Sequence, residues 1–207
     1  MNPLGIFYSP GKTIEDAFKK PDMVTAIILV ILSGIIGIIG SALYGFGIHW
    51  GNVLLKLFSN IVFWLILSAL LYLLLFFFKR YEIRGKFSGV ASCLSLFGMI
   101  GAVLSIVFLL FPFALSSPLF GMLKQYEAKN ISMTEFAQGF ATVLSEQPNS
   151  INLSLIAAIF VVSLILVIYA FILSYLLISR TAKLSIPKNL LIWIAFLVIV
   201  IILQLLS

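Results

Sequence analysis

Five long apolar runs restrict what this chain can fold into more than any other feature. They cover residues 23–43, 53–78, 87–113, 151–178 and 190–206, and none has an Asp, Glu or Arg inside its core. A helix needs about 20 mostly apolar residues to cross a bilayer, and a helix satisfies its own backbone hydrogen bonds there. The sequence therefore predicts an all-α, polytopic transmembrane helical bundle with five spans, which forms one membrane domain over residues 1–207.

The composition supports this class of protein. Hydrophobic residues make up 62% of the chain and charged residues 10%, whereas soluble domains have about 45–50% and about 25%. Nearly the whole chain is therefore expected to lie in or on a membrane.

The basic residues predict the orientation of the bundle, because Lys and Arg gather in cytoplasmic loops. Ten of the 13 lie in three segments that are separated from one another by two spans each and therefore lie on the same side: Lys12, Lys19, Lys20, Lys79, Arg80, Arg84, Lys86, Arg180, Lys183 and Lys188. We expect a cytoplasmic N-terminus, an external C-terminus and a location in the cell membrane. The net charge of +6 is then explained without a nucleic-acid partner.

Two segments outside the spans have amphipathic patterns. In residues 1–22, Ile14, Ala17 and Phe18 share one helical face, which predicts a short helix lying on the cytoplasmic leaflet. Residues 116–150 are predicted to form an external amphipathic loop or helix. Ser132 and Glu135 have the spacing of a capping box at its start.

Small residues recur along one face of the first and third spans. Such stripes allow transmembrane helices to approach closely, so we expect the two faces to pack together and the change Gly37→Ile to weaken folding. The first stripe is Ser33, Gly37, Ser41 and Gly45, and the second is Ser88, Ser92, Ser95, Gly98, Ala102 and Ser105.

Residues that perform catalysis are missing from the predicted spans. Carriers and intramembrane proteases usually place ionisable residues at membrane depth, and a zinc site needs three or four ligands, whereas the chain has one His and one Cys. The sequence therefore predicts no enzyme, no metal and no cofactor.

The segment Gly11-Lys12-Thr13 has the end of a phosphate-binding loop, but five residues separate it from Gly5 instead of the four that the loop needs. It predicts a turn at Pro10-Gly11 and a helix capped by Thr13.

Two groups of polar residues are candidates for binding. His49, Lys56 and Asn60 could line a polar cavity near the external mouth, although Asn60 is also suited to bridging two helices. Lys79, Arg80, Arg84, Lys86, Arg180 and Lys183 could contact anionic lipid headgroups or a partner, or could only fix the topology.

The layout resembles the Yip (Ypt-interacting protein) domain family of five-span integral membrane proteins, in the form of a short prokaryotic-type member. The likeness rests on three stretches: Ser9-Pro10-Gly11-Lys12-Thr13-Ile14 with Ala17-Phe18 and Pro21, "RGKFSGVAS" before a span that ends near Pro112, and "SYLLISRTAKLS" before the last span.

The resemblance implies a role in membranes without catalytic residues. Eukaryotic members are implicated in vesicle traffic with Rab-type GTPases and carry a long soluble N-terminal region. This chain has about 22 residues there, so a GTPase partner is not carried over.

Three functions fit these observations. The favoured hypothesis is a non-enzymatic protein that organises membrane or scaffolds a partner, through contacts with the bilayer, another membrane protein or a second copy of itself. The alternatives are a small carrier, channel or substrate-binding subunit, and a lipid-handling protein with a groove open to the bilayer.

Overall fold

The computed structural model describes residues 2–43, 50–127, 130–147 and 150–206. Within these ranges, the side chains of 33, 41–43, 50, 52, 80, 127, 204 and 206 are not described. The described residues contain no strand, only an isolated antiparallel bridge between Leu115 and Ile151. The helices are α1 (Gly5–Tyr8), α2 (Pro10–Lys19), α3 (Met23–Leu43), α4 (Trp50–Phe78), α5 (Arg80–Ile83), α6 (Phe87–Ser95), α7 (Phe97–Phe108), η1 (Phe111–Ala114), α8 (Ser117–Glu127), α9 (Met133–Glu146), α10 (Leu153–Ala182) and α11 (Ile186–Leu206).

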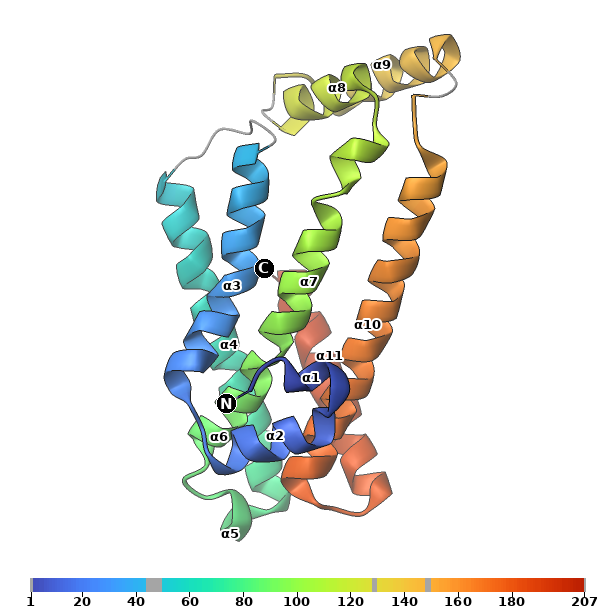
Figure 1. The fold of residues 1–207 in the computed structure, drawn as a ribbon. Coiled ribbons are helices and arrows are strands. Elements are labelled where there is room, and N and C mark those ends of the chain that lie inside the picture. The colour runs from blue at the N-terminus through green and yellow to red at the C-terminus, as the bar shows by residue number, and fades with distance from the viewer. Residues whose placement is uncertain (1, 44–49, 128–129, 148–149, 207) are drawn as a thin grey trace.

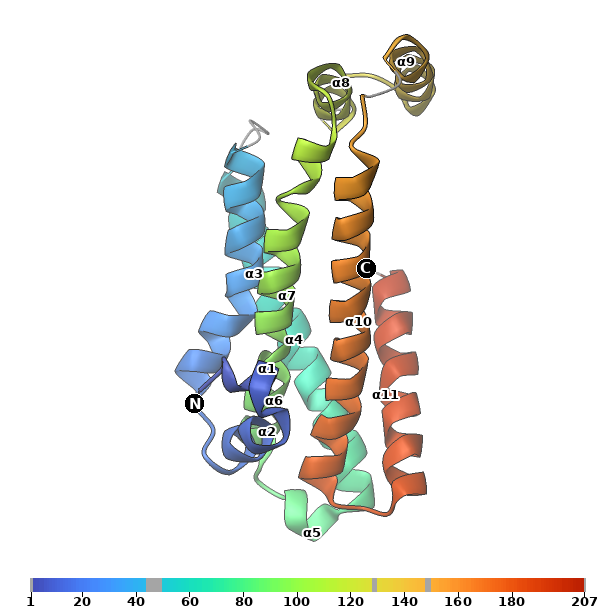
Figure 2. The same cartoon turned by 45° about the vertical axis from the view of Figure 1, so that its right-hand side comes forward.

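The predicted all-α, five-span bundle is confirmed. Five segments of the described chain are long and apolar enough to cross a membrane: α3, α4, α6 with α7, α10, and α11. They run roughly parallel to one another, with α2 and α5 at one end and α8 and α9 at the other (Figures 1 and 2). We call the end with α2 and α5 the basic end. The last two spans begin or end about four residues beyond their apolar runs, because helix continues into the polar flanks.

The third span is interrupted at Leu96, between α6 and α7. Leu96 N donates to Cys93 O at 3.2 Å instead of continuing the i→i−4 pattern. The carbonyl of Ser92, which that pattern would use, accepts the Ser95 hydroxyl at 2.8 Å. A hydroxyl that bonds back to the helix backbone is a recognised cause of bends, and it accounts for the break in a run that the sequence presents as continuous.

The N-terminal helices α1 and α2 pack against the bundle. The apolar face of α2 is buried at Ile14 and Ala17, and Cys93 on α6 donates its thiol to Ile14 O at 3.3 Å. On α1, Ile6 is buried and its carbonyl accepts the hydroxyl of Tyr169 on α10. The predicted helix is present, but its apolar face covers protein instead of resting on the leaflet.

The start of α2 also differs from its prediction. The helix begins at Pro10, and Ser9 at the N-cap makes no side-chain capping bond. Thr13 lies inside the helix, where its hydroxyl donates to Ser9 O at 3.0 Å. Thr13 is therefore not the cap, because proline at the first helical position sets the start earlier.

The predicted capping box at Ser132 is confirmed, and it starts α9. α8 and α9 lie side by side across the end of the bundle opposite the basic end (Figures 1 and 2). The rings of Tyr126 on α8 and Phe136 on α9 are 5.2 Å apart. Where this hairpin leaves and rejoins the spans, Ser116 N donates to Ser150 O at 2.7 Å and Asn152 N donates to Ala114 O at 2.8 Å.

α3 and α7 pack together through glycines, as predicted, but only in part through the predicted ones. A Cβ at Gly98 on α7 would clash with the backbone carbonyl of Leu29 on α3. On α3, a Cβ at Gly40 would clash with the side chain of Leu109, the residue that follows α7. Gly98 thus allows the two backbones to approach, Gly40 makes room for the Leu109 side chain, and Ala102 on α7 is buried as expected.

Gly37 is a correction to the predicted stripe, because no described atom lies within 4 Å of the position that its Cβ would take. Gly34 instead makes the close approach to α4, where Asn60 and Leu57 lie 3.0 Å from its Cβ position. The small residues spaced by four lie along one side of α3. The neighbouring helices α4 and α7 contact other sides of α3. Gly45 and the side chains of Ser33 and Ser41 lie outside the described part of the chain.

Gly98→Ala and Gly37→Ala should have opposite effects on stability. We expect Gly98→Ala to destabilise the fold by about 1–3 kcal/mol, because the new methyl group must push α3 away from α7. Gly37→Ala should be neutral or stabilising by up to about 1 kcal/mol, since alanine favours helix and meets open space. Thermal unfolding in mild detergent measures both, and equal losses in the two variants would contradict this account.

Candidate functional site

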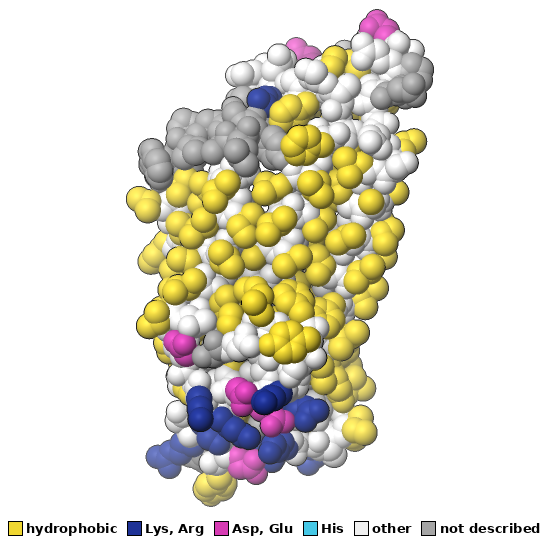
Figure 3. All heavy atoms as spheres, in the orientation of Figure 1, with side chains coloured by type: hydrophobic (Ala, Val, Ile, Leu, Met, Phe, Trp, Pro, Cys, Tyr) yellow, Lys and Arg dark blue, Asp and Glu magenta, His cyan; other side chains and the backbone are white. Residues whose placement is uncertain are grey.

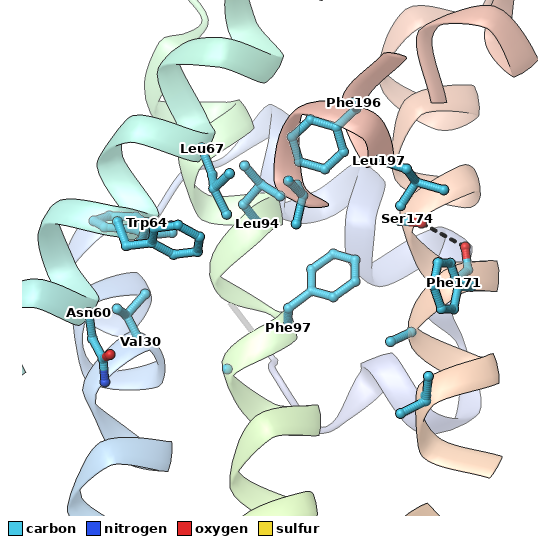
Figure 4. A pocket seen from close by; sticks show the side chains of 15 residues that line it. Val30, Asn60, Trp64, Leu67, Leu94, Phe97, Phe171, Ser174, Phe196 and Leu197 are labelled. Carbon is cyan, nitrogen blue, oxygen red and sulfur yellow. Dashed lines mark hydrogen bonds between the residues drawn. The ribbon is translucent and has the colours of Figure 1, made fainter. Parts of the chain in front are cut away.

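An apolar cavity of about 420 Å³ lies inside the bundle at the level of the spans. Its walls come from α3, α4, α6, α7, α10 and α11, and Figure 4 shows side chains from these helices pointing into the same space. The lining residues are Val30, Asn60, Phe63, Trp64, Leu67, Leu94, Phe97, Gly98, Val167, Ala170, Phe171, Ser174, Phe196, Leu197 and Val200. Apart from Asn60, Trp64 and Ser174, every side chain among them is aliphatic or a phenylalanine, or is glycine.

The polar groups around this cavity are mostly engaged with the helices. Trp64 donates its indole N–H to Ala91 O on α6 at 3.0 Å. Ser174 on α10 accepts the indole N–H of Trp193 at 2.7 Å. The Ser174 hydroxyl donates to Phe171 O at 2.7 Å (Figure 4). These bonds satisfy the groups where water is scarce, so they hold the walls in place and leave the lining apolar.

One side of the cavity reaches the surface of α10. Val167 and Phe171 line it and are still 42% and 46% exposed. Both lie near the middle of α10, which is one of the five candidate spans. On the face shown in Figure 3, hydrophobic side chains form a belt along the spans. An opening at this depth faces hydrocarbon when the protein is in a bilayer.

The predicted polar cavity of His49, Lys56 and Asn60 is only partly formed. Asn60 lines the cavity, next to Gly34 of α3. Lys56 is exposed and is not among the lining residues, because it lies one turn of α4 away from Asn60, beyond the cavity wall. His49 lies outside the described residues.

A second cavity, of about 450 Å³, lies at the basic end, and we call it the basic cavity. It is formed where the end of α2, the α5–α6 turn, the start of α6 and the end of α10 meet. Its lining residues are Glu15, Phe18, Lys19, Pro21, Glu82, Gly85, Lys86, Ser88, Gly89, Arg180, Thr181 and Lys183.

Ion pairs neutralise part of the basic cavity. Arg180 on α10 binds Glu15 on α2 at 3.1 Å, and Lys19 approaches the same carboxylate at 3.7 Å. Lys79 binds Glu82 at 2.8 Å, and this side-chain hydrogen bond lowers the pKa of Glu82 below its usual value. Both carboxylates are thus engaged by cations on the neighbouring elements.

The six predicted headgroup or partner contacts divide into three groups. Lys86, Arg180 and Lys183 line the basic cavity. Lys79 pairs with Glu82, and Arg84 is exposed and does not line the cavity. The side chain of Arg80 is not described. Lys19 also lines the basic cavity, and its place there depends on the docking of α2, which no local pattern encodes.

The described residues contain no group of three or more His, Cys, Asp and Glu side chains that could hold a metal ion. The single cysteine, Cys93, is buried under α2.

Comparison with known proteins adds no relative. No protein-family model matches the chain, no curated protein matches it, and no solved structure matches it. The resemblance to the Yip domain family therefore stays a prediction from the sequence motifs.

Two serines on α10 allow the hydrogen bonds of the cavity wall to be tested. Ser174→Ala should destabilise the protein by about 1 kcal/mol, because Trp193 loses its acceptor in an apolar environment. Ser163 is the matched control, since its buried hydroxyl has no hydrogen-bond partner among the described residues. Ser163→Ala should be neutral or stabilising in thermal unfolding, and a loss equal to that of Ser174→Ala would contradict the assignment.

Proposed function

We propose that this protein is a non-enzymatic, multi-pass membrane protein of the Yip-domain type that organises membrane by holding a lipid hydrocarbon chain in its apolar cavity. The observation that carries the proposal is the cavity of about 420 Å³ at the depth of the spans. Its size falls within the range of ligand pockets, which is about 300–1,000 Å³.

The chemistry of the lining favours a hydrocarbon occupant. Phe63, Phe97 and Phe196 surround the space with Leu67 and Leu197, and no charged side chain lines it. The exposed edge at Val167 and Phe171 gives lipid chains a lateral entry. An apolar chain that enters from the bilayer loses no hydration, so shape and dispersion contacts decide its affinity.

The same lining argues against the carrier or channel alternative. A polar solute would need a continuous path of hydrogen-bonding groups, because each unsatisfied polar group in a dry site costs several kcal/mol. Among the described residues, Asn60 and Ser174 are widely separated on α4 and α10, and Lys56 lies outside the cavity. We therefore rank lipid holding above solute transport.

The remaining predictions on location and partners belong to this proposal. We propose that the basic end faces the cytoplasm and that the membrane is the cell membrane, on the distribution of Lys and Arg. The bilayer is the primary partner, and a second copy or another membrane protein is compatible with lipid holding. A GTPase partner is not part of the proposal.

Filling the cavity should displace the lipid. We expect Ala170→Phe on α10 to lower the amount of lipid that purifies with the protein at least severalfold, because the ring occupies the space of the chain. Ala157→Phe is the control, since Ala157 lies exposed on the same helix and does not line the cavity. The measurement is mass spectrometry of lipids extracted from the two detergent-purified variants and the parent protein.

The thermal unfolding of both variants shows whether they fold. If folded Ala170→Phe protein retained as much lipid as Ala157→Phe protein, lipid holding in this cavity would be wrong. Flux of a solute into liposomes that Asn60→Leu abolishes would establish the carrier instead.

A further inference from the structure

The basic cavity carries more positive than negative charge. Four cationic side chains and two carboxylates line it. Glu15 is shared by Arg180 and Lys19, and Glu82 is bound by Lys79. Lys86 and Lys183 form no direct ion pair with any described carboxylate, although both act electrostatically on Glu82 from a longer distance. An excess of this kind, gathered in a concave site, favours an anion.

The start of α6 adds backbone donors to the same cavity. The first intrahelical hydrogen bond of α6 runs from Val90 N to Lys86 O at 3.2 Å, so the N–H groups of Ser88 and Gly89 precede it. The N-cap residue is Lys86, which makes no capping bond. Lysine has no acceptor atom, and a cation at the positive end of a helix dipole is unfavourable. No described side chain caps this end of α6, and an anion in the cavity would supply an acceptor.

Close packing holds these donors in place. A Cβ at Gly89 would lie 2.6 Å from the backbone carbonyl of Phe18 on α2, so α2 and α6 meet without room for a side chain. The ammonium of Lys86 lies 5.5 Å from the centroid of the Phe18 ring. The docked helix α2 thus forms one wall of the cavity and keeps Lys86 at the N-terminal end of α6.

The level of the cavity identifies the source of the anion. The Lys, Arg, Asp and Glu side chains form a band at the basic end, directly beyond the hydrophobic belt (Figure 3). Leu4 and Tyr8, at the two ends of α1, are exposed. Lipid phosphates lie at this boundary between hydrocarbon and water.

We propose that the basic cavity binds the phosphate of an anionic lipid headgroup, with Lys86 and Lys183 and the N–H groups of Ser88 and Gly89 as its ligands. The two cavities share no lining residue, so this inference does not depend on what occupies the apolar cavity.

Binding can be measured with the full-length protein in neutral detergent. Dioctanoyl phosphatidic acid is the probe, and thermal unfolding at increasing probe concentration gives its apparent Kd. We expect saturable stabilisation by phosphatidic acid and none by dioctanoyl phosphatidylcholine, whose phosphate is shielded by its choline group. Inorganic phosphate is the third arm and tests for a free anion.

Two variants test the lysines. The first has a control variant, and the second is chosen so that it does not disturb the backbone. Lys86→Gln should weaken phosphatidic acid binding about fivefold, the effect of one charge near a membrane surface. Lys124→Gln is its control, because Lys124 also lies over a phenylalanine ring, 5.1 Å from the centroid of Phe120, but on α8. Lys183→Gly should weaken binding similarly without unfolding the protein. Lys183 has φ of 48°, and glycine adopts this left-handed conformation without a steric cost.

Each outcome decides the proposal. Stabilisation by phosphatidic acid that Lys86→Gln and Lys183→Gly reduce, and Lys124→Gln does not, supports a headgroup site. Equal affinity for inorganic phosphate with the same dependence on the two lysines supports the phosphate site but assigns it to a free anion. Equal stabilisation by phosphatidylcholine, an equal effect of Lys124→Gln, or no stabilisation by any probe overturns the proposal.

Discussion

The close approach of α7 to the backbone of α3 is the contact on which the rest of the bundle depends. Helices in a bilayer gain little from burying apolar surface, because lipid is equally apolar, so they associate where backbones can come near each other. Gly98 provides this approach at Leu29, and Gly40 makes room for the side chain of Leu109. With α7 fixed on α3, α4 and α10 stand on either side of it, and the apolar cavity lies between these walls.

The sequence could predict the spans because their signal is local. Length and hydropathy determine them, so four of the five boundaries at the start of the spans agree within three residues, from Met23 to Leu153. The capping box at Ser132 is likewise a contact between near neighbours. The break at Leu96 was not predictable, because serine hydroxyls bond to the backbone in many straight helices and only the surrounding packing decides the outcome.

The candidate sites could be predicted only as lists of residues. Lys86, Arg180 and Lys183 were identified by charge, but their convergence depends on α2 docking against α6 and α10, which joins residues far apart in the chain. Asn60 was identified by polarity, whereas the phenylalanines and leucines around it look like any others in a span. Gly37 was misplaced because a regular spacing names a face of a helix without saying what that face contacts.

The two hydrogen bonds at the base of the α8–α9 hairpin have a consequence for how the protein can be engineered. Ser116 is hydrogen-bonded to Ser150, and Asn152 to Ala114, so the two ends of the hairpin are held next to each other. We call this pair of hydrogen bonds the clasp. We expect that a module attached in this way can be exchanged without moving α7 relative to α10. The clasp is therefore a suitable junction for grafting a rigid fiducial domain for electron microscopy.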